Sequence, residues 1–362
     1  MARNDAVWSA QGTTPDAIEA ALRELLAQRH AENAAYAPAR VLNMLVFVED
    51  AWSGEVANRL RGVGRYHASR VIVLAYDPRR ERLDARASIA ADEPASGELA
   101  LLRETVVVRI GPHHLDDLHT IADPLVVTDL PTLLWSPHGH EDAAEALLSL
   151  AQAALVDSID EPVWHAAIRR ACELSRRVYV VDLAWLRTTP WRERIAAVFD
   201  SGRMRAELPQ IEAMRVRHHP SSTVAAMLLA GWLSSRLGWE PSAMRAAAHN
   251  GGARTLAGAA RADAGEVALE LTSAPELEVP GLAGVEVTCR SGLRVRLDRG
   301  AGGLRAHQRE PDGDERSWTL LGASRGESGI LGEGIRQALL RDPTYTPALG
   351  AAQSMLPDLA TA

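Results

Sequence analysis

The stretch that decides the fold runs from residue 40 to residue 75 and reads RVLNMLVFVEDAWSGEVANRLRGVGRYHASRVIVLA. Residues 40–48 are a continuous apolar run, which is typical of a strand covered on both faces of a sheet. Residues 54–64 have helical spacing, and residues 70–75 are a second apolar run. The stretch therefore predicts a strand, a helix and a second strand, the repeating unit of a parallel α/β sheet.

The same alternation continues along the chain. We expect further strands at residues 104–110, 132–135, 153–156, 178–181 and 211–217, separated by helices, with a helix at 15–35 before the first strand and an apolar helix at 222–237. Residues 78–97 are charged and weakly patterned, which predicts a surface excursion. Residues 125–130 fit either a helix end or a strand. The pattern predicts an α/β domain over residues 1–238, with a mainly parallel, Rossmann-like sheet and helices on both faces.

After residue 238 the pattern changes to short strand-like segments with Gly-rich or charged turns, at residues 266–271, 284–289, 293–298 and 303–308. Residues 242–256 resemble a helix, and Ser324 to Glu327 has the spacing of a capping box before a last helix to about Leu340. These features predict a smaller α+β domain over residues 239–345 with a short antiparallel sheet. Residues 346–362 carry two prolines and are expected to form a C-terminal tail.

Composition excludes several classes of protein. A net charge of −8 argues against a general nucleic-acid binder, which needs a basic surface to meet phosphates. All 39 basic residues are Arg, which removes catalytic and phosphate-loop lysines. The longest apolar run, residues 224–233, is too short to cross a membrane, so we expect a cytoplasmic protein without a membrane partner. The two cysteines are far apart, and we interpret both as reduced thiols.

No motif in the sequence indicates a catalytic site or a cofactor-binding site. The sequence has no Gly-x-Gly-x-x-Gly turn, no Walker A loop and no Gly-x-Ser-x-Gly nucleophile elbow. Its histidine pairs do not match zinc-ligand spacings. We therefore expect no metal, no cofactor and no enzymatic activity.

The segment of residues 180–200, here called the Trp–Arg segment, reads VVDLAWLRTTPWRERIAAVFD. It places Trp185, Arg187, Trp191 and Arg192 where a buried strand leads into a helix. Thr189 is expected to be the N-cap of that helix, with Pro190 at the first helical position. Large planar side chains commonly anchor binding surfaces, but they also commonly pack into cores. The segment is therefore either a ligand or partner site, or a part of the core.

Four predicted strands end at an acidic residue, namely Asp50, Asp77, Asp157 or Asp182. The carboxyl ends of parallel strands line the crevice where ligands bind, although Asp also commonly ends a strand by bonding loop amides. We favour a functional role only for Asp157 and Asp182, which must then lie close together. Residues 129–135 are a second place where a buried strand is expected to end at a Trp, here Trp135. The candidate partner or ligand surface consists of Asp129, Trp135, Asp157, Asp182, Trp185, Arg187, Trp191 and Arg192.

Several segments with fixed spacing resemble one family. Residues 129–135, Asp157-Ser158, residues 182–192 and the helix at 222–239 are similar to the glucose-6-phosphate dehydrogenase assembly protein OpcA family, in its actinobacterial form. The resemblance covers most of residues 37–240. It implies a non-enzymatic protein that binds glucose-6-phosphate dehydrogenase, promotes its active oligomer and supports NADPH production in the oxidative pentose phosphate pathway. The alternative is a sugar-phosphate or nucleotide-sugar enzyme, and a small metabolite in the sheet-edge crevice fits either hypothesis.

Overall fold

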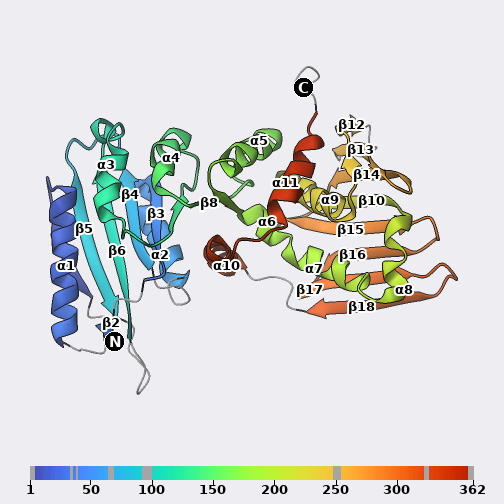
Figure 1. Cartoon of the computed structure of the whole chain (residues 1–362), viewed down its shortest axis with the longest axis horizontal. Helices are drawn as coiled ribbons and strands as arrows, with labels where there is room; N and C mark the ends of the chain where they lie inside the picture. The colour runs from blue at the N-terminus through green and yellow to red at the C-terminus, as the bar shows by residue number, and fades with distance from the viewer. Residues whose placement is uncertain are drawn as a thin grey trace. The chain divides into compact units, whose positions relative to one another are not determined.

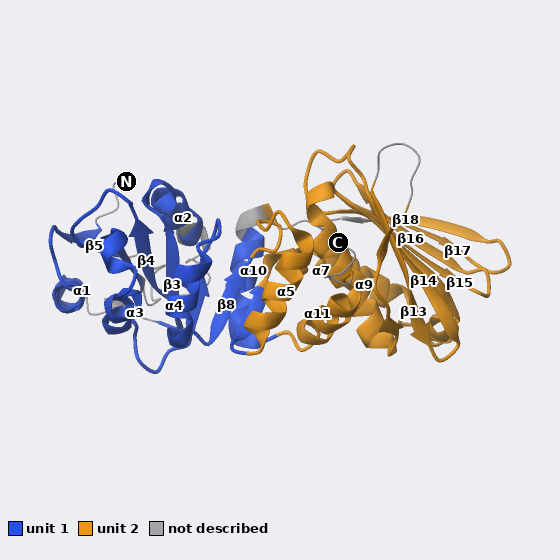
Figure 2. Ribbon diagram, turned by 90° about the horizontal axis from the view of Figure 1, so that it is seen from above, with its two compact units in different colours: residues 1–156, 177–181, 327–341 blue, residues 157–176, 182–326, 342–362 orange. Residues whose placement is uncertain are grey.

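The computed structural model describes residues 5–32, 36–37, 40–63, 69–91, 100–247, 254–321 and 326–357. The chain forms two compact units (Figures 1 and 2). Unit 1 comprises residues 1–156, 177–181 and 327–341, and unit 2 comprises residues 157–176, 182–326 and 342–362. The chain thus passes between the units several times, rather than once near the expected boundary at residue 238.

Unit 1 contains a sheet whose strand order is β1-β5-β6-β4-β3-β7-β8-β9, with β2 beside β6. The strand bounds are β1 Ala6–Ala10, β2 Tyr36–Ala37, β3 Leu42–Glu49, β4 Ser69–Tyr76, β5 Asp84–Ala91, β6 Ala100–Ile110, β7 Thr132–Trp135, β8 Ala153–Val156 and β9 Tyr179–Asp182. The central pairs from β6 to β8 are parallel, whereas β5 and β1 are antiparallel additions at one edge. This sheet confirms the mainly parallel arrangement predicted from residues 40–75.

Helices cover both faces of the first sheet, with α2 on one side and α1, α3 and α4 on the other (Figure 2). Their bounds are α1 Pro15–Glu32, α2 Asp50–Val63, α3 Leu118–Ala122 and α4 Glu141–Leu147. Every residue of β3 except Glu49 is buried, which explains why its sequence is continuously apolar rather than alternating. Helix α10, Gly326–Leu340, is confirmed where predicted. Of the expected capping box, Ser324 lies outside the described residues, and the side chain of Glu327 is not described.

Unit 2 contains a larger sheet than the four short segments led us to expect. Its strand order is β11-β13-β14-β10-β15-β16-β17-β18, with β12 beside β13. The strand bounds are β10 Ile211–His218, β11 Glu240–Pro241, β12 Arg245–Ala247, β13 Thr255–Ala262, β14 Gly265–Ser273, β15 Leu282–Cys289, β16 Arg294–Gly300, β17 Gly303–Arg309 and β18 Glu315–Leu321. Among the described strands, β10 and β14 are parallel, and the other paired neighbours are antiparallel.

The core of unit 2 is built around α9, Thr223–Leu237, which is buried from Val224 to Ser234. A helix that is apolar on all sides must be enclosed by other elements. Helix α9 contacts β10 and β14 on one side, and α5, α6 and α11 elsewhere. The remaining helices of this unit are α5 Trp164–Ser175, α6 Leu183–Arg187, α7 Thr189–Val198, α8 Gly202–Arg205 and α11 Tyr345–Ser354.

Four expectations about the elements were wrong. Strand β10 and helix α9 belong to unit 2 rather than to the first domain, because β10 pairs with β14 and β15. Residues 78–97 contain β5, whose alternate residues Ala85, Ala87 and Ile89 are buried. Residues 242–256 contain β12 and the start of β13, because strand pairing overrides the helical preference of an Ala-rich segment. The expected tail contains α11, which packs against α9.

Candidate functional site

The Trp–Arg segment consists of a strand end followed by two helices in close succession. Strand β9 ends at Asp182, the one-turn helix α6 follows at once, and α7 begins at Thr189 with Pro190 in its first turn. Asp182 caps α6, since its Oδ1 accepts a hydrogen bond from the Ala184 amide at 2.9 Å. Thr188, rather than Thr189, occupies the N-cap position of α7.

Asp182 is buried and is bonded on both oxygens. Oδ1 also accepts a hydrogen bond from the Ser158 amide at 3.2 Å, and Oδ2 accepts one from Ser158 Oγ at 2.5 Å. Burial and, to a smaller extent, the nearby Asp157 carboxylate raise the pKa of Asp182, and the hydrogen bonds from Ser158 and Ala184 lower it, so that the pKa is about 6. Asp182 thus ties the segment after β8 to the start of α6.

Asp157 forms an ion pair with Arg187. The guanidinium meets the carboxylate with two bonds, Nη1 to Oδ1 at 2.8 Å and Nη2 to Oδ2 at 2.7 Å. The side chains of Arg187 and Asp157 retain 17% and 12% of their exposure. The structure therefore brings Asp157 and Asp182 close together, as expected, but internal donors already occupy both carboxylates.

Trp185 and Arg192 form a second cluster in unit 2. The Arg192 guanidinium carbon lies 3.5 Å from the centroid of the Trp185 ring. Trp185 Nε1 donates a hydrogen bond to Asp342 Oδ2 at 3.0 Å, and the Tyr345 ring lies 5.6 Å from the Trp185 ring. Residues from α6 and α7 thus meet residues at the start of α11, 150 or more positions away in the sequence.

The charges of this cluster are compensated within it. Arg192 donates to Thr188 Oγ1 from Nε at 3.0 Å and to Thr189 Oγ1 from Nη2 at 2.9 Å. Burial lowers the pKa of Arg192 to about 10, which leaves it charged at neutral pH. Burial alone raises the pKa of Asp342, but hydrogen bonds from Thr344 and Trp185, together with the charge of Arg192, hold it below its ordinary value.

The candidate surface from the sequence is largely not a surface. Five of its eight residues are less than 9% exposed, namely Trp135, Asp182, Trp185, Trp191 and Arg192. The planar groups of Trp185 and Arg192 stack on each other, and Trp135 lies in β7 between β3 and β8. The core interpretation therefore describes these five residues. Asp129 and Trp135 belong to unit 1, and Asp129 is exposed with a φ of 71°.

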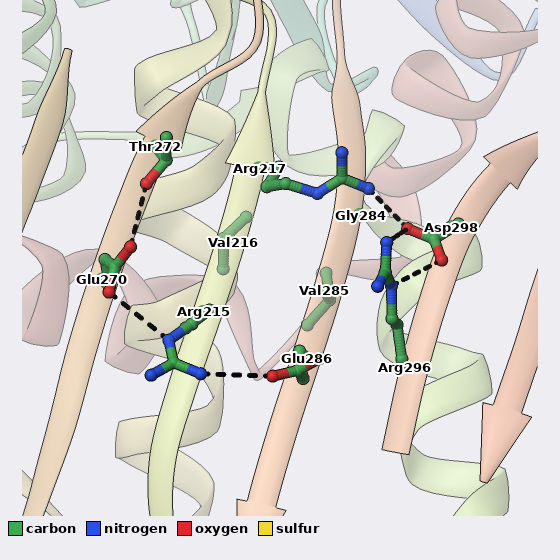
Figure 3. Close-up of a pocket in the computed structure, with 10 residues that line it drawn as sticks. All are labelled: Arg215, Val216, Arg217, Glu270, Thr272, Gly284, Val285, Glu286, Arg296 and Asp298. Atoms are coloured by element: carbon green, nitrogen blue, oxygen red, sulfur yellow. Dashed lines mark hydrogen bonds and ion pairs between the residues drawn. The ribbon is translucent and has the colours of Figure 1, made fainter. Parts of the chain in front are cut away.

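The outer face of the second sheet is a feature that the sequence analysis missed. A hollow of about 320 Å³ lies on this face and is lined by residues of β14, β10, β15 and β16. Figure 3 shows these residues. Arg215 lies between Glu270 and Glu286, at 3.4 Å and 3.3 Å. Asp298 lies between Arg217 and Arg296, at 2.5 Å and 2.7 Å. The available signal was the alternation of charged and apolar residues in three of these strands.

Two features bear on the chemistry of the chain. Within the described residues, no group of three or more His, Cys, Asp or Glu side chains could hold a metal ion. In the same part of the chain, no helix is both long enough and apolar enough to span a membrane.

Comparison with known sequences identifies the family. Residues 61–173 match the N-terminal domain of the glucose-6-phosphate dehydrogenase subunit family, and residues 178–349 match the C-terminal domain of the same family. OpcA of Synechococcus elongatus, named as a candidate OxPP cycle protein, is 26% identical over 146 residues, covering 39% of this chain and 33% of that protein. OpcA of Nostoc punctiforme is 31% identical over 121 residues, covering 32% of this chain and 26% of that protein. The matched region thus spans about a third or less of these relatives.

Among solved structures, the chain is similar to the super-repressor mutant of Gal80p from Saccharomyces cerevisiae, with a TM-score of 0.50 and 9% sequence identity. The alignment covers 88% of this chain and 94% of that chain. At this identity the similarity concerns the fold alone, and it agrees with the Rossmann-like first sheet. The two consecutive domain matches and the OpcA relatives show that the chain belongs to the OpcA family of glucose-6-phosphate dehydrogenase assembly proteins.

Proposed function

We propose that the protein is a non-catalytic, cytoplasmic assembly factor that binds glucose-6-phosphate dehydrogenase and promotes its active oligomer. In this role it supports NADPH production in the oxidative pentose phosphate pathway. The observation that carries the proposal is the pair of matches over residues 61–173 and 178–349, both of which are to domains of a glucose-6-phosphate dehydrogenase subunit. In this proposal the enzyme is activated because binding of the protein is energetically coupled to formation of the enzyme's active oligomer.

The bonding of the Trp–Arg segment supports a role in holding the protein in shape. The two guanidinium groups that could bind an anionic substrate are instead paired, Arg187 with Asp157 and Arg192 with Thr188, Thr189 and the ring of Trp185. A substrate would have to displace these internal partners, and a buried charge that loses its partner is costly. The alternative of a sugar-phosphate enzyme at this position is therefore not favoured.

We further propose that the eight candidate residues serve the partner in two ways. Asp182, Trp185, Trp191 and Arg192 are buried and fix the geometry of α6 and α7, and Trp135 is buried in the first sheet. The accessible residues, Asp129 and the Asp157–Arg187 pair, are the members able to touch a partner or a small metabolite. Trp191→Ala separates these roles. It is expected to lower the thermal stability of the chain and to leave the affinity of the folded fraction for the dehydrogenase unchanged. Weaker binding by a chain of wild-type stability would instead make Trp191 part of the interface.

The proposed function is tested by mixing the purified chain with the dehydrogenase of the same organism. We expect faster NADPH formation, followed by its absorbance, and a complex heavier than the dehydrogenase alone by light scattering. The chain without the dehydrogenase, given glucose 6-phosphate and NADP⁺, is expected to form no NADPH. An unchanged rate together with an unchanged mass would overturn the proposal, whereas NADPH formation by the chain alone would favour an enzyme.

A further inference from the structure

The outer face of the second sheet carries an ordered grid of charges. Side chains alternate across a strand, so Arg215 and Arg217 of β10 lie on one face, and Val216 lies on the other, buried one. On the outer face the side chains of Arg215, Arg217 and Arg296 remain 53%, 43% and 47% exposed. This face is therefore open to solvent in the isolated chain.

The strand register arranges these side chains in rows. Arg215 pairs with Glu270 on one side and with Glu286 on the other, and Glu286 pairs with Arg296. Across β14, β10, β15 and β16, the first row thus reads Glu270, Arg215, Glu286, Arg296, with alternating signs (Figure 3). The adjacent row reads Thr272, Arg217, Gly284, Asp298.

We infer that this face binds a second copy of the same chain, related by a two-fold axis that runs between β10 and β15 and parallel to them. Such an axis places β10 opposite β15 of the second copy and β14 opposite β16, and each row then faces the same row of the second copy. Arg215 then faces Glu286 of the second copy, and Glu270 faces Arg296 of the second copy. The first row is thus complementary in charge to itself, and every pair occurs twice, as a two-fold interface requires.

The register also discriminates against the other two-fold axis in the plane of the face. An axis perpendicular to the strands, between the two rows, places Arg215 opposite Arg217 of the second copy. Like charges in contact are costly, and charge patterns of this kind set the orientation in which two surfaces dock. The axis parallel to the strands is therefore the one selected.

Gly284 leaves room in the middle of the face for the Arg217 side chain of the same chain. It lies in the hollow of about 320 Å³ and, in the two-fold arrangement, opposite Arg217 of the second copy. The Asp298 carboxylate borders the same hollow and pairs in register with Gly284. A Cβ atom at residue 284 would lie 2.7 Å from Arg217 Nη2 and 2.8 Å from Asp298 Oδ1. Glycine at this position thus leaves space for the Arg217 guanidinium of the same chain to reach the Asp298 carboxylate.

The face is large enough for a stable dimer. Seven strands in a row, from β13 to β18, at about 4.8 Å each, span about 29 Å, and strands of their length extend about 25 Å. The face therefore offers on the order of 700 Å², close to the ~800 Å² that each partner contributes to a standard interface.

The test uses complementary charge changes in the full chain, without the dehydrogenase, so its outcome is independent of the proposed function. By analytical ultracentrifugation we expect the wild-type chain to be a dimer. Arg215→Glu places Glu opposite Glu286 of the other copy, and Glu286→Arg places Arg opposite Arg215, so each variant alone is expected to be monomeric. In a mixture of the two variants, the new Glu of one chain faces the new Arg of the other, and Glu286 of the first chain faces Arg215 of the second. Heterodimers are therefore expected.

Two further variants guard against misfolding. Glu276→Arg makes the same charge change as Glu286→Arg, but in an exposed loop, and this variant should remain dimeric. Arg215→Gln introduces no like charges within the row and should weaken the dimer about tenfold, because two ion pairs are lost in each dimer. A monomeric wild-type chain at high micromolar concentration, or an Arg215→Gln chain with unchanged dimer affinity, would overturn the inference. So would a monomeric wild-type chain whose dehydrogenase complex is lost in Arg215→Glu, since the face would then serve that partner.

Discussion

The Arg192 guanidinium lies 3.5 Å above the ring of Trp185, and both side chains are buried. The pair joins α6 to α7, and Asp342, which bonds Trp185 Nε1, extends the cluster to the start of α11. Because a planar guanidinium can stack and donate in its plane at the same time, Arg at this position is not interchangeable with Lys. The segment that the sequence left as either a binding site or a part of the core is thus a junction of three helices in unit 2.

Arg192→Lys tests this junction. Lysine keeps the charge but loses the stacking plane and the bonds from Nε and Nη2 to Thr188 and Thr189. We expect a loss of about 1–3 kcal/mol in the free energy of unfolding, measured by chemical denaturation and far-UV circular dichroism. The control is Arg236→Lys in the last turn of α9, where an exposed Arg is replaced and stability should change by less than about 0.5 kcal/mol. Equal stabilities of the two variants would contradict the proposed importance of the stack.

Asp182→Asn should change how stability depends on pH. The pKa of Asp182 is raised in the folded chain to about 6 from an ordinary value of 3.8, so its contribution to stability is complete below pH 4 and is lost as the pH rises through 6. This difference corresponds to on the order of 3 kcal/mol. The side-chain oxygen of asparagine can still accept the hydrogen bonds from the Ser158 and Ala184 amides, and its nitrogen can donate one to Ser158 Oγ. We therefore expect the variant to gain stability relative to wild type between pH 4 and pH 7, as measured by urea titrations at each pH. A difference that is constant with pH would show that Asp182 does not titrate in this range.

Gly231→Ala should separate α9 from α11. A Cβ atom at residue 231 would lie 2.3 Å from the Ala348 carbonyl oxygen and 3.0 Å from the Ala352 nitrogen, so backbone would have to move. We expect a loss of about 1–3 kcal/mol or more, measured by thermal denaturation, as is usual for overpacked cores. The matched control is Gly350→Ala in α11, where nothing lies within 4 Å of the new Cβ atom. That variant should gain up to about 1 kcal/mol, because alanine favours the helix.

The two cysteines should be inert in the folded chain. Burial raises the pKa of Cys172 to about 11 and the pKa of Cys289 to about 12, the latter with help from the Glu207 carboxylate. The thiolate is the reactive form, so little of either residue is available at pH 8. We expect slow reaction with a disulfide reagent in the native protein and rapid reaction of both thiols in guanidinium. Rapid labelling of the native protein would show that a reactive thiolate is accessible in the folded chain.

Local patterns predicted most elements of the chain. Strands β7 and β8 were predicted with the bounds that they have, and α9 was predicted to within one residue at its start, because long apolar runs and clear flanking residues mark them. Strand β5 was missed because two of the three buried residues described in this strand are Ala, whose small side chain gives a weaker apolar signal than Val, Ile or Leu. The sequence also misplaced β10, since nothing local distinguishes a strand of the first sheet from a strand of the second.

The candidate site was only partly predictable, for a related reason. Proximity of Asp157 and Asp182 follows from adjacent strand ends, and the structure connects both through Ser158 and its neighbours. The burial of Trp185 and Arg192 depends on Asp342 and Tyr345, which are more than 149 residues away in the chain and were expected to lie at or near a tail. The charge rows of the second sheet likewise depend on the register of four strands.

By itself, the sequence determined the alternation of strands and helices, the mainly parallel first sheet and the family, because these depend on local apolar spacing and on fixed motif spacing. Only the tertiary structure decided that the Trp–Arg segment is core, that α11 closes unit 2 and that the charges of β14, β10, β15 and β16 lie in complementary rows. The physical reason is that burial and strand register come from contacts between segments distant in the chain, and a single segment does not carry the information about which distant segment covers it or pairs with it.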